Sequence, residues 1–173
     1  AKGIVNALPW RPHLLSNISF GQGISVTPMQ LVNAYVAIAN GGWLKRPIIV
    51  KSIRPKGEEE ATVFNAESVR QVLSTTDAAT LGMMLTAATD EQATGAKARI
   101  PGYLVAGKTG TAQKVDGQKG GYKANAYISS FAGFVPAQEP KYVIYVAVDD
   151  PQKAYYGSQV AAPIFAKIAQ FLV

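Results

Sequence analysis

With 173 residues, 48% of them hydrophobic and 16% charged, the chain is long and apolar enough for one folded domain with its own core. It contains no cysteine and one histidine, His13, which excludes disulfides, thiol chemistry and a histidine-rich metal site, and we expect neither a metal nor a cofactor. The formal net charge is +6, and the apolar runs are far shorter than the roughly 20 residues of a membrane helix.

The first residues predict irregular structure. The chain starts abruptly at Ala1 without a signal-peptide pattern, so we expect it to come from a longer protein. Prolines interrupt residues 1–18, which leaves room for a short helix at most and places His13 at the surface. Residues 19–26 are rich in glycine and predict a turn that leads into a helix.

The best-marked helix of the chain follows this turn. Thr27 is placed to be its N-cap, Pro28 its first residue, and Gln30 the third, which completes a capping box. The helix is predicted to end at residues 40–42, Asn-Gly-Gly. Because apolar residues occur all around its circumference, we expect it to be buried.

The middle of the chain predicts a mixture of elements. Residues 44–53 are expected to be extended, with Pro47 confining part of them to a sheet edge, and residues 55–60 to form a surface turn rather than an acidic metal site. Helices are predicted from Asn65 or Ala66 to about residue 73 and, capped by Thr76 or Asp77, to about residue 89. We expect the methionines to fill the core. Residues 90–101 predict a connector.

The last part of the chain predicts an antiparallel sheet covered by a helix. Strands are expected over residues 103–113, 127–135 and 142–148, in a meander. Residues 114–126 are expected to form a long, mobile loop, and residues 160–172 to form an amphipathic helix across the sheet. The fold class is therefore α/β, more specifically α+β, with helices packed on an antiparallel sheet.

The central strand contains the sequence Lys108-Thr109-Gly110-Thr111. Side chains alternate along a strand, so Lys108 and Gly110 share one face and the two threonines the other. Glycine in mid-strand marks a place where a ligand or another backbone comes close. This pattern predicts a strand that presents a cation and hydroxyl groups to an anionic, peptide-like partner, although an ordinary strand or turn also fits so short a motif.

Positive charge is concentrated around this strand. Residues 97–123 carry six cations against one anion, Asp116. Such a basic face is either simply solvated or attracts partners with carboxylates or other anionic groups. Nucleic acid is not expected, because the stretch has only two aromatic residues and no recognisable nucleic-acid motif. The cations are Lys97, Arg99, Lys108, Lys114, Lys119 and Lys123.

A phosphate-binding loop is an alternative interpretation. Residues 102–109 satisfy the pattern G-x-x-x-x-G-K-[ST], and residues 143–149 are an apolar run that ends in an aspartate suited to magnesium. Such a loop needs a strand before its first glycine and a helix that begins at the Lys-Thr pair. Residues 97–101 are charged and end in proline, and four glycines with no helical period follow Lys108. The nucleotide interpretation therefore ranks second.

Taken together, these stretches resemble the C-terminal half of a penicillin-binding protein transpeptidase domain, and more narrowly a class B protein of septal or side-wall peptidoglycan synthesis. Residues 19–31, with Phe-Gly-Gln-Gly at 20–23, and residues 101–113, Pro-Gly-Tyr-Leu-Val-Ala-Gly-Lys-Thr-Gly-Thr-Ala-Gln, carry the resemblance. Residues 127–136 and 141–150 follow at suitable spacing, so that it covers essentially the whole chain. It implies the penicillin-binding and β-lactamase-like serine transpeptidase fold.

In this family a serine in a Ser-x-x-Lys motif attacks the penultimate D-Ala carbonyl of a stem peptide that ends in D-Ala-D-Ala. An amine of a neighbouring stem then resolves the acyl-enzyme, and β-lactams imitate the substrate. The resemblance implies as partners stem peptides, β-lactam antibiotics, the N-terminal part of the same domain and other cell-wall synthesis proteins. It also implies a membrane-anchored, periplasmic location on the extracytoplasmic face of the cytoplasmic membrane, with the anchor outside this chain.

The resemblance assigns roles to the central strand. Lys108 supplies positive potential and positions the hydroxyl of the second motif, Ser-x-Asn. Thr109 and Thr111 bind the terminal carboxylate of the substrate, and the backbone N–H of Thr111 is an oxyanion-hole donor. Gly110 lets the peptide lie antiparallel beside the strand.

The chain departs from the family pattern in lacking both serine motifs. None of its serines is followed by lysine at the third position or by asparagine at the second. We therefore expect residues 1–173 to be the C-terminal portion of one transpeptidase domain and to be inactive alone. Residues 91–95 are also less glycine-rich than is common in the family. A β-lactamase or penicillin-sensor relative and a non-catalytic interaction fragment are further alternatives.

Overall fold

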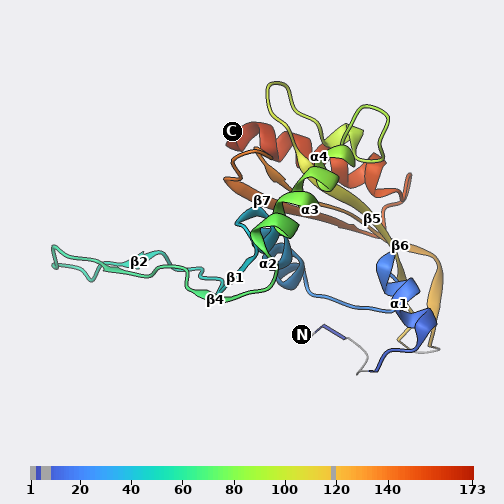
Figure 1. Ribbon diagram of the computed structural model, residues 1–173, viewed down its shortest axis with the longest axis horizontal. Helices are drawn as coiled ribbons and strands as arrows, with labels where there is room; N and C mark the ends of the chain where they lie inside the picture. Colours follow the sequence, from blue (N-terminus) through green and yellow to red (C-terminus); the bar gives the residue numbers. More distant parts are fainter. Residues whose placement is uncertain (1–2, 5–8, 118–119) are drawn as a thin grey trace.

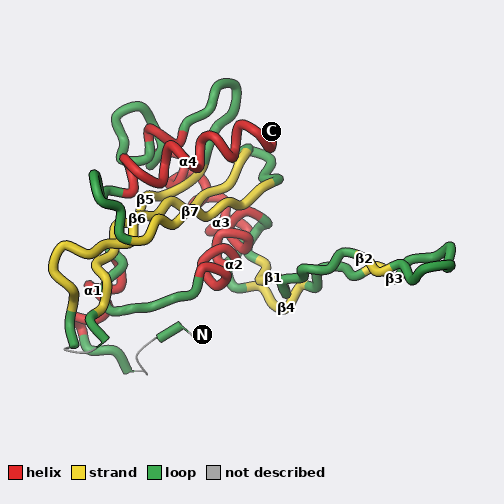
Figure 2. The backbone as a smooth tube through the Cα atoms, turned by 180° about the vertical axis from the view of Figure 1, so that it is seen from behind, coloured by secondary structure: helices red, strands yellow, loops and turns green. Residues whose placement is uncertain are grey.

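The computed structural model of the protein describes residues 3–4, 9–117 and 120–173. A three-stranded antiparallel sheet with helices on both faces forms the body, and a long two-stranded arm, residues 46–72, projects from it (Figures 1 and 2). Helix α4 (Gly157–Leu172) lies on one face of the sheet, and helices α2 (Pro28–Ala39) and α3 (Thr75–Ala87) lie on the other. Within the described residues, no helix is both long and apolar enough to cross a membrane.

The sheet is the predicted antiparallel meander. Strands β5 (Ala106–Val115), β6 (Tyr122–Val135) and β7 (Tyr142–Asp149) follow one another in space as in sequence. Gly107 lies opposite Gly133 and Thr111 opposite Ser129, and this register places the Lys-Thr-Gly-Thr sequence opposite residues 129–132 of the longest strand. Strand β5 is an edge strand, because among the described strands only β6 pairs with it.

The prediction of a long loop over residues 114–126 is wrong. The β5–β6 ladder continues to a pairing of Val115 with Tyr122, after a shift of register that follows Gln113. The glycines that suggested a loop occupy only the turn, where Gly120 and Gly121 have φ angles of 72° and 74°. Cross-strand pairing therefore extends almost to that turn, and residues 118–119 lie outside the described part.

Helix α4 closes the main core, as predicted, although it begins three residues earlier than expected. The rings of Phe131 on β6 and Phe165 on α4 lie 4.6 Å apart, and both are fully buried. The helix presents fully buried alanines to the sheet, which lets its backbone approach the strands closely. These residues are Ala161, Ala162 and Ala169.

Helix α2 begins with the predicted capping box. The Thr27 hydroxyl accepts a hydrogen bond from the Gln30 N–H at 3.2 Å, and the Gln30 side-chain oxygen accepts one from the Thr27 N–H at 2.8 Å. Both bonds satisfy backbone donors that a helix N-terminus otherwise leaves without partners. The helix ends at Ala39, just before the predicted Asn-Gly-Gly stop.

Replacement of Thr27 by alanine is expected to lower the free energy of unfolding by about 1 kcal/mol, because the Gln30 N–H loses its acceptor. Denaturant-induced unfolding of the protein measures the change. Thr76→Ala is the matched control, since Thr76 is exposed on helix α3 and no described hydrogen bond uses its hydroxyl. Equal losses in the two variants would contradict a specific role for the cap.

The expectation that this helix is buried is wrong for the described structure, in which Ala37 is its only buried residue. The sheet, α3 and β1 each contact part of α2, but together they leave most of its residues partly or fully exposed. The methionines are not core residues either. Met29 is 53% exposed, Met83 67% and Met84 62%. An apolar circumference predicts burial only where other elements cover every side of the helix.

Helix α3 begins slightly earlier than predicted and ends at Ala87, two residues before the expected end. Its N-cap is Ser74, whose hydroxyl accepts a hydrogen bond from the Asp77 N–H at 3.0 Å, so the predicted caps Thr76 and Asp77 lie within the first turn. The helix predicted to begin at Asn65 or Ala66 is wrong. That region contains strand β4 (Ser68–Gln71), which pairs with β1 (Trp43–Lys45). Pairing with a distant strand overrides local helix propensity.

The remaining elements are short. Helix α1 (Pro12–Ser19) is the short N-terminal helix, and His13 on it is exposed as predicted. The predicted extended stretch 44–53 is interrupted over residues 46–51, which include Pro47, and its ends lie in β1 and in β2 (Ser52–Ile53). Strand β2 pairs with β3 (Thr62–Val63). Between β2 and β3 lies the predicted surface turn, in which the Glu58 N–H donates to the Pro55 carbonyl at 3.2 Å. The connector before β5 contains a short 3₁₀ helix, η1 (Ala96–Ala98).

Candidate active site

The Lys-Thr-Gly-Thr sequence lies in the middle of the edge strand β5. The Lys108 side chain is exposed, and its ammonium group lies 3.2 Å from both the hydroxyl and the carbonyl oxygen of Thr109. The predicted alternation assigns these two side chains to opposite faces. The long lysine chain nevertheless reaches its neighbour, so that a cation and a hydroxyl group meet on this strand.

The connector before β5 contributes a residue that sequence reasoning missed. The Thr109 hydroxyl donates to the hydroxyl of Thr94 at 3.4 Å, and therefore links Lys108 to the connector. The same connector is fixed near its start, where the buried Thr89 hydroxyl donates to the Val105 carbonyl at 2.7 Å. The only signal for Thr94 in the sequence was its place before a glycine in residues 91–95, the stretch that is less glycine-rich than is common in the family.

Helix α4 orients the second threonine. The Gly157 N–H donates to the Thr111 hydroxyl oxygen at 3.1 Å, and Thr111 itself is exposed. Because this oxygen accepts the amide hydrogen, the hydroxyl hydrogen is left to donate to a ligand. A side chain at Gly157 would overlap the carbonyl oxygens of Gly110 and Ser130. Only glycine therefore lets the start of α4 lie directly on the backbones of β5 and β6.

Gly110 has a reason of its own for lacking a side chain. A Cβ atom at this position would lie 2.5 Å from the hydroxyl oxygen of Ser130, which is its partner on β6. Gly107 is more constrained, since its Cβ would lie 2.6 Å from the ring of Phe131 and 2.8 Å from the carbonyl oxygen of Ala132, whereas the serine hydroxyl beside Gly110 can rotate. The packing of β5 on its own sheet thus accounts for Gly107, and a ligand beside Gly110 stays a prediction.

An aromatic cluster of three tyrosines borders the strand beyond Thr111. Tyr127, the partner of Gln113 on β6, stacks on Tyr155 with ring centroids 4.5 Å apart. The Tyr155 hydroxyl donates to that of Tyr156 at 3.0 Å, and this hydrogen bond raises the pKa of Tyr155. The buried Ser129 hydroxyl donates to the Tyr155 carbonyl and holds the segment in place. Sequence reasoning missed the cluster because Tyr127 lies far in the chain from the adjacent Tyr155 and Tyr156.

The basic stretch is less uniform than its composition indicates. Lys114 forms an ion pair with Asp149 at 2.7 Å, and this hydrogen bond raises the lysine pKa. Arg99 pairs with Glu91 at 2.8 Å. The described hydrogen bonds of Lys108 go only to Thr109, which is uncharged. Lys108 is therefore a cation on the open strand whose charge no described ion pair neutralises, and Lys119 lies outside the described residues.

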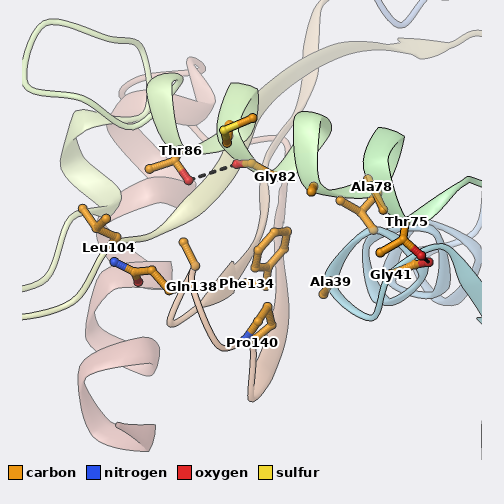
Figure 3. Close-up of a pocket in the computed structure, with 14 residues that line it drawn as sticks. Ala39, Gly41, Thr75, Ala78, Gly82, Thr86, Leu104, Phe134, Gln138 and Pro140 are labelled. Carbon is orange, nitrogen blue, oxygen red and sulfur yellow. Dashed lines mark hydrogen bonds between the residues drawn. The ribbon is translucent and has the colours of Figure 1, made fainter.

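A pocket of about 460 Å³ lies elsewhere, between α2, α3 and the turn after β6 (Figure 3). Phe134, Pro140 and the hydrogen-bonded pair Gly82 and Thr86 are among its lining residues, whereas Lys108 and its neighbours on β5 are not. The candidate site is accordingly an open strand edge. The phosphate-loop alternative is wrong, because Lys108 lies within a strand and no helix begins there to hold a phosphate.

Comparison with known proteins agrees with this geometry. The family model described as penicillin binding protein transpeptidase domain matches residues 2–170. The chain belongs to this transpeptidase family. It is 40% identical to the penicillin-binding protein PbpB of Mycolicibacterium smegmatis over 95% of this chain and 26% of that protein. It is 38% identical to the peptidoglycan D,D-transpeptidase FtsI of Escherichia coli over 92% of this chain and 25% of FtsI.

Solved structures of the transpeptidase family confirm the fold. Penicillin-binding protein 3 of Mycobacterium tuberculosis aligns with a TM-score of 0.85 and 36% identity, over 98% of this chain and 40% of that one. That protein has also been solved in complex with aztreonam and with ampicillin. The predicted class B resemblance and the α+β fold of helices on an antiparallel sheet are thereby confirmed. The chain spans about a quarter of the length of the curated relatives it matches.

Proposed function

We propose that residues 1–173 are the C-terminal portion of a D,D-transpeptidase domain that crosslinks peptidoglycan through a serine acyl-enzyme. The nucleophile and the Ser-x-Asn motif then lie outside this chain, on the N-terminal part of the same domain. The observation that carries the proposal is the open edge of β5. Lys108, whose charge no described ion pair neutralises, and the Thr111 hydroxyl, whose hydrogen is left to donate, lie within four residues of each other on this strand. The transpeptidase relatives support this assignment.

The roles of the residues follow from this geometry. A stem peptide that ends in D-Ala-D-Ala lies antiparallel to β5 and completes its unpaired edge. The hydroxyl group of Thr111 donates to its terminal carboxylate, the hydroxyl group of Thr109 does the same when it turns from Thr94 to the bound peptide, and Lys108 adds positive potential. The backbone N–H of Thr111 donates to the oxyanion that forms at the attacked carbonyl. Gly110 leaves room for the peptide backbone.

The reaction consists of two acyl transfers. The serine oxygen attacks the carbonyl carbon of the penultimate D-Ala, the bond to the terminal D-Ala nitrogen breaks, and D-Ala leaves with the proton. An amine of a second stem then attacks the ester and releases the serine. A β-lactam acylates the same serine, but its ring nitrogen stays attached, so the acyl-enzyme persists. The similarity to the penicillin-binding protein PbpB and to the peptidoglycan D,D-transpeptidase FtsI supports β-lactams and stem peptides as the ligands.

The chemistry also sets the place of action. Because peptidoglycan lies outside the cytoplasmic membrane, the protein acts at the extracytoplasmic face, and a membrane anchor lies outside residues 1–173. Other cell-wall synthesis proteins are the expected partners. A β-lactamase or a penicillin sensor differs in the lifetime of its acyl-enzyme, and a non-catalytic fragment differs in that pairing with the N-terminal part restores no acylation.

Intact-mass and peptide-mass analysis of the whole protein after incubation with penicillin tests the proposal. We expect one adduct, on a serine outside residues 1–173, and unmodified peptides throughout the present chain. An adduct on one of the serines of this chain would overturn the assignment of the nucleophile. Absence of any adduct would favour the non-catalytic alternative.

Replacement of Thr111 by valine is expected to slow penicillin acylation of the whole protein by about 10- to 100-fold, because a hydrogen bond to a charged carboxylate contributes roughly 1.5–3 kcal/mol. The rate of labelling by a fluorescent penicillin measures the effect. Thr62→Val on strand β3 is the matched control, since this exposed threonine lies on the arm. Equal rates for the Thr111 variant and the parent protein would exclude the proposed contact.

A further inference from the structure

The arm (residues 46–72) is an exposed structure that the proposed active site does not use. It extends far from the body as two strands side by side (Figures 1 and 2). Every residue in it is exposed except Ala61, which is half-buried. Large apolar side chains are nevertheless frequent on it, and Ile49 is 94% exposed. Clustered apolar residues of this kind mark interaction surfaces. They include Ile48, Ile49, Val50, Ile53, Val63 and Phe64.

The arm has little of its own to hold it extended. At its base the arm is anchored through the preceding residue Lys45, whose carbonyl accepts a hydrogen bond from the Asn33 side-chain amide at 2.9 Å. An ion pair between Arg46 and Glu67 at 3.4 Å joins the two halves of the arm to each other. Farther out, the strand pairing spans only residues 52–53 and 62–63. A lone two-stranded hairpin without a core is marginally stable in water. A third strand would give the outer arm the pairing that it lacks.

The two strands of the arm differ in charge. The outgoing half, residues 46–56, carries four cations and no acid. The returning half, residues 57–72, carries four glutamates and a single cation, Arg70. The basic half also contains the exposed run Ile48 to Val50. The outgoing edge therefore matches a segment that is both acidic and apolar.

The strand pairing identifies which backbone groups are free to bind. The Phe64 N–H donates to the Lys51 carbonyl at 2.8 Å, so these two residues form a hydrogen-bonded pair. In an antiparallel ladder the next pair, Ser52 and Val63, points its backbone groups away from the partner strand. The N–H and carbonyl of Ser52 thus face the outer edge of β2, and those of Val63 face the opposite edge.

We propose that the arm is a docking strand for another protein, which adds an extended acidic and apolar segment to the outer edge of β2. A second copy of this chain does not fit that edge. Symmetric pairing of two outgoing strands would place the cations of one copy against those of the other. Pairing of an outgoing strand with the returning strand of a second copy is head-to-tail, so each copy added leaves another free edge and the assembly does not close. Main-chain hydrogen bonds would supply affinity, and the cations of the outgoing half would supply selectivity.

The test uses the whole protein and two short labelled peptides, one alternating valine with glutamate and one alternating valine with lysine. Fluorescence anisotropy measures binding. We expect only the acidic peptide to bind, and more weakly as salt rises. Ser52→Pro removes the outward N–H of β2 and should weaken binding on the order of tenfold or more. Val63→Pro is the matched control, because it removes the outward N–H of the other edge and should leave binding within about twofold.

Several outcomes would overturn the proposal. These are failure of the acidic peptide to bind, equal binding of both peptides, and equal weakening by the two proline variants. Binding of the arm to vesicles that contain anionic lipid, lost on Arg54→Glu, would assign the surface to a membrane instead. Labelling by fluorescent penicillin should be unchanged in all arm variants, so this test is independent of the proposed transpeptidase function.

Discussion

Replacement of Lys108 by alanine is expected to slow penicillin acylation of the whole protein about 100-fold or more, the range for loss of one preorganised group that stabilises the transition state. The effect is large because no described ion pair neutralises this lysine, so its full charge acts on the site. Loss of the lysine also removes the ammonium group that donates a hydrogen bond to the Thr109 hydroxyl oxygen. Both carboxylate binding and the potential of the site are then weakened together.

The second-order rate of labelling by a fluorescent penicillin measures this change. Lys123→Ala is the matched control, because Lys123 is an exposed cation on β6 within the same basic stretch. If general attraction by the basic face were the whole effect, the two variants would lose similar amounts, and both losses would disappear at high salt. A loss confined to Lys108 and retained in salt assigns it to the site itself.

Replacement of Gly157 by alanine is expected to destabilise the protein by roughly 3 kcal/mol, at the upper end of overpacking effects. The added methyl group would meet the carbonyl oxygens of Gly110 and Ser130, which are backbone atoms and cannot rotate away. The start of α4 must therefore move off the sheet. Because Gly157 also donates to Thr111, the hydroxyl loses its orientation, and acylation should fall together with stability.

Thermal unfolding and penicillin labelling of the same variant check both effects. Gly117→Ala is the matched control, because no atom lies within 4 Å of the position of its Cβ. The control should unfold and react as the parent protein does. A Gly157 variant with an unchanged melting temperature would show that α4 does not rest on the backbone of β5 as described.

Features that depend only on neighbouring residues in the sequence were predicted correctly. The capping box at Thr27 needs only four consecutive residues, and the alternating pattern of strands β6 and β7 needs only a few more. The central Lys-Thr-Gly-Thr strand was predicted for the same reason. Its functional meaning came from the family resemblance, because the tripeptide alone fits many proteins.

Features that depend on distant contacts were missed. Strand β4 carries a helical pattern, and only its pairing with β1, over 20 residues away, makes it extended. Thr94 and Gly157 reach the strand from separate parts of the chain, 14 residues before Lys108 and 49 after it, and no spacing rule connects them. The exposure of Met83 and Met84 likewise depends on what packs around α3, which composition does not specify.

The open edge of β5 has a consequence for how the protein behaves in solution. An edge strand that can accept a peptide can equally pair with the same strand of another molecule, which is a route to aggregation. A charged residue such as Lys108 on that edge opposes self-pairing, because two copies bring like charges together. The lysine thus keeps the edge of the strand free to bind a peptide, in addition to its proposed role in acylation. Variants that lack it are expected to self-associate as their concentration rises, and light scattering alongside each kinetic measurement will separate this loss of free protein from a loss of chemistry.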